Sequence, residues 1–122
     1  MTSDVQGRKV KVAHGLDIHG PWIDTAQLDL TNPGLQQQLV KVMDYLLDLT
    51  NGGGIRIDAA DLTTKESVFT RLGRSMNKEF WPDAFKFLRS KYPNALFVAE
   101  TFWTQQNLFQ KFGADLTYDM NF

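Results

Sequence analysis

From Asn32 onward, helix-forming segments alternate with short apolar segments of strand character. Asn32 precedes Pro33, and this pair is typical of a helix start because asparagine caps the first turn and proline fits its first position. Apolar spacing predicts helices over residues 33–50, 63–75, 82–91 and 105–112, and strands over residues 55–59, 95–99 and 115–119. Strands separated by helices pair in parallel through right-handed crossovers, so the sequence predicts an α/β fold.

The first 30 residues lack this alternation. They are polar, and four turn-forming residues interrupt them: Gly7, Gly15, Gly20 and Pro21. A loop of this length is uncommon in a compact domain unless it is functional or its packing partner is missing. We therefore expect residues 1–30 to form an irregular extension and residues 31–122 to form the folded α/β part.

Composition argues against several classes of function. The chain has 13 basic and 14 acidic residues, and a net charge of −1 argues against a nucleic acid as main partner. No apolar run approaches the roughly 18 residues of a membrane span, and no secretory signal is recognised, so the compartment stays open with a slight preference for the cytoplasm. The chain contains no cysteine, which excludes disulfides and thiolate chemistry. Only His14 and His19 supply imidazoles, and no metal site is predicted.

An acidic residue ends each predicted strand. These residues are Asp58, Glu100 and Asp119. The carboxyl ends of parallel strands gather at one edge of a sheet, which is where functional residues of such folds collect. Two facing carboxylates are what glycoside hydrolysis requires. We therefore expect Asp58 and Glu100 to lie on adjacent strands as a candidate catalytic pair.

The neighbours of the two carboxylates differ in character. Arg56 lies two residues before Asp58, hence on the same face of a strand, and its charge favours an ionised nucleophile. Glu100 stands beside Phe102 and Trp103, and an apolar setting suits a general acid. Each feature also has a structural interpretation: an Arg-x-Asp pair is commonly an ion pair, a terminal glutamate is commonly solvated, and tryptophan is commonly core.

Four segments resemble glycoside hydrolase family 13, the α-amylase family. Gly54–Ala59 resembles the motif G-F-R-x-D-A, and Phe97–Trp103 resembles F-x-x-E-x-x. Trp22–Pro33 looks like the lead-in W-x-D-T-x-Q-L, and Gly113–Asp119 is similar to G-F-D-x-x-Y-D. The segments follow the order and spacing of the family and run from Trp22 to the end of the chain.

The resemblance implies a (β/α)8 TIM barrel, of which this chain is similar to strands four to six. It implies that Asp58 is the nucleophile, Glu100 the general acid/base, and Arg56 the partner that orients Asp58. The implied substrate-binding residues are Trp103, Tyr118 and Asp119. The implied reaction is retaining cleavage or transfer at an α-glucosidic bond of an α-glucan or α-glucoside.

The chain departs from the family pattern at three places. The third-strand motif (an Asp followed by Asn-His) and the seventh-strand His-Asp motif have no counterpart, and Asp61-Leu62 stands where many members have Lys-His. We therefore expect a central barrel fragment, nearly inactive alone and prone to self-association through exposed sheet edges. No cofactor is expected from these residues, and calcium is left open for a full-length enzyme.

Two other interpretations remain at this point. One is a noncatalytic carbohydrate-binding or interaction protein derived from the same barrel. The other is a small open-sheet α/β domain of flavodoxin type, which suits the length and leaves the four family-like segments unexplained.

Overall fold

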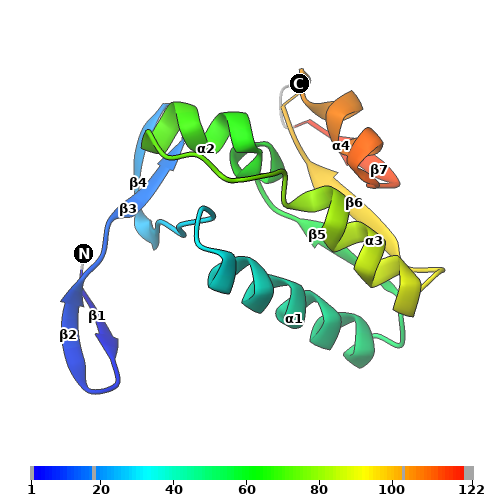
Figure 1. Cartoon of the computed structure of the whole chain (residues 1–122), viewed down its shortest axis with the longest axis horizontal. Coiled ribbons are helices and arrows are strands. Elements are labelled where there is room, and N and C mark those ends of the chain that lie inside the picture. The colour runs from blue at the N-terminus through cyan, green and yellow to red at the C-terminus, as the bar shows by residue number, and fades with distance from the viewer. Residues whose placement is uncertain (1, 18, 103, 120–122) are drawn as a thin grey trace.

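A parallel three-stranded sheet forms the centre of the α/β part (Figure 1). The computed structural model describes residues 2–17, 19–102 and 104–119. The sheet contains β5 (Gly54–Ile57), β6 (Leu96–Glu100) and β7 (Leu116–Tyr118), in the order β5-β6-β7. This arrangement confirms the α/β prediction, with the three expected strands in parallel. Within the described residues the sheet stays open and does not close into a barrel.

The helices begin and end close to the predicted positions. They are α1 (Pro33–Leu49), α2 (Lys65–Leu72), α3 (Trp81–Lys91) and α4 (Gln106–Phe112), with a 3-10 helix η1 at Ala60–Thr63. Asn32 caps α1, as expected, by accepting hydrogen bonds from the backbone of Gly34 and Leu35. The second helix starts later than predicted because η1 occupies Thr63, and Thr64 caps α2 instead.

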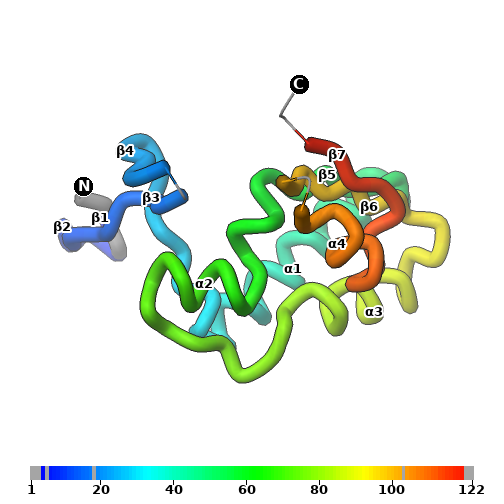
Figure 2. Tube along the Cα trace, turned by 90° about the horizontal axis from the view of Figure 1, so that it is seen from above, coloured from blue at the N-terminus to red at the C-terminus, as the bar shows by residue number. Residues whose placement is uncertain are grey.

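One face of the sheet packs against helices (Figure 2). Phe97 of β6 is fully buried, and its ring lies 5.0 Å from that of Phe85 of α3. Leu47 of α1 and Phe109 of α4 complete this core from either side. Gly54 lets β5 approach β6, since a Cβ there would lie 2.4 Å from the carbonyl oxygen of Leu96.

No helix of the described residues packs on the opposite face of the sheet. Leu96 and Leu116 project from it and are about half exposed, at 45% and 54%. Helix α1 also carries an exposed apolar stripe with helical spacing: Val42, Tyr45, Leu46 and Leu49. Parallel sheets are ordinarily covered on both faces, so a sheet face without a packed helix is unusual for an α/β domain.

The N-terminal segment forms two β-hairpins, which corrects the expected irregular extension. One pairs β1 (Thr2–Val5) with β2 (Arg8–Lys11), and the other pairs β3 (His14–Asp17) with β4 (Gly20–Ala26). Gln6 and Gly7 both have positive φ, as a two-residue hairpin turn requires. Gly7, which the sequence assigned to an irregular extension, therefore lies in the tight turn of a hairpin. The hairpins project from one end of the molecule (Figures 1 and 2).

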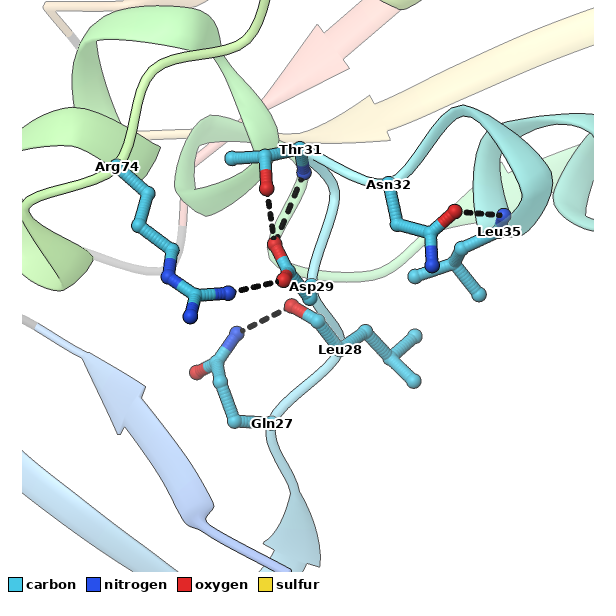
Figure 3. Close-up of polar contacts among 7 residues, drawn as sticks. All are labelled: Gln27, Leu28, Asp29, Thr31, Asn32, Leu35 and Arg74. Atoms are coloured by element: carbon cyan, nitrogen blue, oxygen red, sulfur yellow. Dashed lines mark hydrogen bonds and ion pairs between the residues drawn. The ribbon is translucent and has the colours of Figure 1, made fainter.

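Polar contacts fasten the segment that leads into α1 (Figure 3). Asp29 accepts hydrogen bonds from the backbone and the hydroxyl of Thr31 at 3.1 and 2.6 Å, and it forms an ion pair with Arg74. Arg71 of α2 donates to the carbonyl oxygens of Leu16 and Leu62, which joins the second hairpin to η1. The hairpin is thus attached to the α/β part near the carboxyl end of β5.

A partly exposed ion pair between Arg89 and Asp115 connects α3 to the sheet. Their atoms Nη2 and Oδ1 lie 2.7 Å apart, and Oδ2 of Asp115 accepts from the backbone N–H of Phe97 at 2.8 Å. Burial disfavours the charged form of Asp115, but the hydrogen bonds from Phe97 and Arg89 outweigh it, so the pKa lies below its ordinary value of 3.8. The contact joins α3 to both β6 and β7.

We predict that Asp115→Asn lowers the free energy of unfolding by about 1 kcal/mol, because the acceptor of the hydrogen bonds from Arg89 and from the Phe97 N–H is then no longer charged. With a lowered folded-state pKa, the contribution of Asp115 is fully present above pH 3.8 and disappears as the pH falls below it. Urea denaturation at pH 7 and at decreasing pH measures both effects. Asp48→Asn, an exposed aspartate of α1, is the control, and an equal loss in both variants would contradict the prediction.

Candidate active site

Arg56 contacts three side chains at the carboxyl end of the sheet. Its Nη1 lies 2.7 Å from Oδ1 of Asp58, and its Nη2 lies 3.0 Å from Oε2 of Glu100. Its Nε donates to the hydroxyl of Tyr118 at 2.6 Å. The structure therefore brings Arg56, Asp58 and Glu100 together, as the alternation along parallel strands indicates.

The two carboxylates have different environments. The side chain of Asp58 is 73% exposed, whereas that of Glu100 is 10% exposed. Glu100 is buried, and its polar partners among the described residues are a guanidinium and a backbone N–H. Oε2 accepts both hydrogen bonds, from Arg56 and from the backbone of Ala59 at 2.9 Å.

Ala59 adopts a left-handed conformation directly after Asp58. Its φ and ψ are 43° and 46°, a region that costs an L-residue on the order of 1 kcal/mol. This turn aims the N–H of Ala59 across to Glu100 on the neighbouring strand. The turn after β5 thus supplies a fixed donor to the carboxylate that ends β6.

Asp61 is a buried carboxylate near the site that the sequence identified only as a departure from the family pattern. It lies in η1 and is 6% exposed. Burial raises its pKa, its own backbone N–H and the charge of Arg71 oppose that rise, and the charges of Glu100 and Asp119 add to it. An aspartate three residues after a candidate nucleophile gives no sequence signal of burial, which comes only from the 3-10 turn.

The remaining predicted residues are placed in part. Tyr118 ends β7 and points its hydroxyl at Arg56, and Asp119 follows it half-buried at the same edge of the sheet. Trp103 lies outside the described residues. In the part of the chain that the structure describes, no group of three or more histidine and acidic side chains is arranged to hold a metal ion.

Asp58 lies at the surface of the molecule, whereas Glu100 is largely buried. One groove of the molecule, about 500 Å³, lies between α1 and α3, where Val40, Phe80 and Phe87 are among its lining residues. None of Arg56, Asp58 and Glu100 lines it. The site as it stands can present two carboxylates and a guanidinium to a ligand, but it encloses none.

Comparisons of the chain with protein-family models, with curated proteins and with solved structures found no match. Among the described helices, none combines the length and the apolar character that crossing a membrane demands. The function of the chain must therefore be argued from its own residues.

We predict that Arg56→Met lowers the free energy of unfolding more than a loss at an exposed ion pair does, because the buried carboxylate of Glu100 then keeps the Ala59 N–H as its one partner among the described residues. Chemical denaturation measures the loss, and Glu100→Gln in the Arg56→Met background should restore part of it. Arg74→Met is the matched control, since Arg74 and Asp29 form an exposed pair worth less than about 1 kcal/mol. Equal losses at Arg56 and Arg74 would show that Arg56 has no special role.

Proposed function

We propose that this chain carries the nucleophile and the general acid/base of a retaining α-glycoside hydrolase or transglycosylase that acts on α-glucosidic bonds. The observation that carries the proposal is the contact of two carboxylates, from adjacent parallel strands, with one guanidinium at the carboxyl end of the sheet. The four segments that resemble glycoside hydrolase family 13 supply the reaction class and the α-glucan or α-glucoside substrate.

In this proposal Asp58 attacks the anomeric carbon and forms a glycosyl ester, while the glycosidic oxygen leaves with a proton from Glu100. Glu100 then takes a proton from water or from an acceptor sugar, whose oxygen displaces Asp58. The exposure of Asp58 makes it accessible to a substrate, and Arg56 balances its negative charge. Both hydrogen bonds that Glu100 accepts from described residues fall on Oε2, so Oε1 is the oxygen that would carry the transferred proton.

The uncovered surfaces support a barrel as the complete form of this fold. In a (β/α)8 barrel, the face of the sheet opposite the helices lines the packed interior, and each helix packs against its neighbours in the outer ring. The exposed Leu96 and Leu116 lie on the first of these surfaces, and the apolar stripe of α1 would belong to the second. On this proposal the chain corresponds to strands four to six with their helices.

We predict that Asp58 forms a covalent adduct with a fluorinated α-glucosyl fluoride, a reagent whose glycosyl ester hydrolyses slowly. Mass spectrometry of the full chain after prolonged incubation detects one covalently attached glycosyl group per molecule, and peptide mapping places it at Asp58. Asp58→Asn abolishes the adduct, and Asp48→Asn leaves it unchanged. Glu100→Gln still forms it, because fluoride leaves without help from a general acid.

The chain is expected to be nearly inactive in turnover, because the open site encloses no substrate and the family's seventh-strand His-Asp motif has no counterpart. Sustained hydrolysis of an aryl α-glucoside by the purified chain would contradict this part of the proposal. No adduct together with measurable binding of an α-glucan would favour the alternative, a noncatalytic carbohydrate-binding or interaction protein.

We also propose that the chain self-associates through its exposed sheet. The outer edges of β5 and β7 have no strand partner among the described residues, and Leu116 of β7 is an exposed apolar residue on one of these edge strands. Sedimentation velocity should show larger species as the concentration rises, and Leu116→Lys should weaken the association. Leu28→Lys, at a leucine of similar exposure outside the sheet, should not weaken it. A concentration-independent monomer would rule this out.

A further inference from the structure

Tyr118 lies two strands away from Arg56 and still contacts it. Arg56 belongs to β5 and Tyr118 to β7, and Glu100 of β6, which pairs with Tyr118 in the strand register, lies between them. The Nε of Arg56 donates to the hydroxyl of Tyr118 at 2.6 Å, and its Cζ lies 5.7 Å from the centre of the tyrosine ring. The contact between the Arg56 and Tyr118 side chains therefore spans the three strands of the parallel sheet.

We propose that Tyr118 is a positioning residue, which holds the guanidinium of Arg56 between the two carboxylates so that each receives one terminal nitrogen. This role replaces the substrate contact that the sequence suggested for Tyr118, and its meaning for catalysis rests on the proposed function. The three nitrogens of Arg56 then have three different acceptors: Tyr118, Asp58 and Glu100.

The planarity of the guanidinium explains why the hydroxyl matters. Its nitrogens are held in one plane, so fixing the direction of Nε restricts where both terminal nitrogens point. An arginine beside a single carboxylate tends to form a bidentate pair with it. Without the hydroxyl, Arg56 can turn both terminal nitrogens toward the exposed Asp58, and Glu100 then keeps, of its described partners, the N–H of Ala59.

The position of Tyr118 is determined independently of Arg56. Its carbonyl oxygen accepts from the backbone N–H of Thr101 at 2.9 Å, so the pairing of β6 with β7 continues past Glu100 and places Tyr118. Its side chain is half-buried at the end of β7. The strand pairing therefore holds Tyr118 in place, and its hydroxyl accepts a hydrogen bond from the more exposed Arg56.

The division of the guanidinium has a chemical consequence. Retaining glycosidases need their two carboxyl groups at a narrow separation, about 5–5.5 Å. A guanidinium that contacts both Asp58 and Glu100 restrains their separation, whereas a guanidinium paired with Asp58 alone does not. Tyr118 would thus control the geometry of the pair without touching either carboxylate in the contacts described.

The test compares Tyr118→Phe with Tyr92→Phe in the full chain. The first variant keeps the ring and removes only the hydroxyl, and the second removes a hydroxyl that contacts Asp44 on α1. Nitrogen-15 NMR follows hydrogen exchange at Nε of Arg56. We expect exchange about tenfold faster in Tyr118→Phe, the factor for losing one hydrogen bond, and no change in Tyr92→Phe. Unchanged exchange in Tyr118→Phe would overturn the proposal.

Labelling by the fluorinated α-glucosyl fluoride provides the second readout. If the wild-type chain is labelled, Tyr118→Phe should be labelled several-fold more slowly while its thermal midpoint matches that of Tyr92→Phe. An unchanged labelling rate would overturn the positioning role in the reaction. If the wild-type chain is not labelled and exchange still responds to Tyr118→Phe, the proposed function fails while the structural assignment of Tyr118 stands.

Discussion

The burial of Phe97 against the helices determines the direction of every side chain on the sheet. Its ring packs on Phe85, and Arg89 lies over it with Cζ 4.9 Å from the ring centre. Since side chains alternate along a strand, burying Phe97 and Ala99 sends Glu100 to the other face. The parallel pairing then brings Arg56 to the same face. The candidate site is therefore a consequence of how the core packs, and not an addition to it.

Local signals in the sequence were sufficient for much of the α/β part. The Asn32-Pro33 pair marks the start of α1 because the cap is a contact within one turn of the chain. The apolar runs around Phe97 and Ile57 give strands because both are buried on the helix side. The convergence of Asp58 and Glu100 could also be predicted, since it follows from parallel pairing alone. The family roles and the complete barrel remain proposals.

Other features depend on contacts that no local pattern encodes. The strands of the two hairpins are short, and their described side chains are mostly exposed, so no buried apolar run identifies them in the sequence. The N–H of Ala59 reaches Glu100 because Ala59 has a left-handed backbone conformation, which cannot be predicted from an alanine in the sequence. Tyr118 meets Arg56 across 62 positions of sequence. The motif around Tyr118 suggested a substrate contact. The contact with Arg56 follows from the pairing of the three strands, which the motif does not encode.

The one-sided sheet also divides its residues by parity. On β5 and β6 the odd-numbered residues, Ile55, Ile57, Phe97 and Ala99, face the helices, and Thr117 of β7 contacts α4. The even-numbered residues Arg56, Glu100 and Tyr118 meet on the open face. A substitution at an odd position changes the volume and shape of the core, whereas a substitution at an even position changes the charge and hydrogen bonds of the site. The charged and hydrogen-bonding residues of this sheet can therefore be substituted at alternate positions while the residues of the core stay the same.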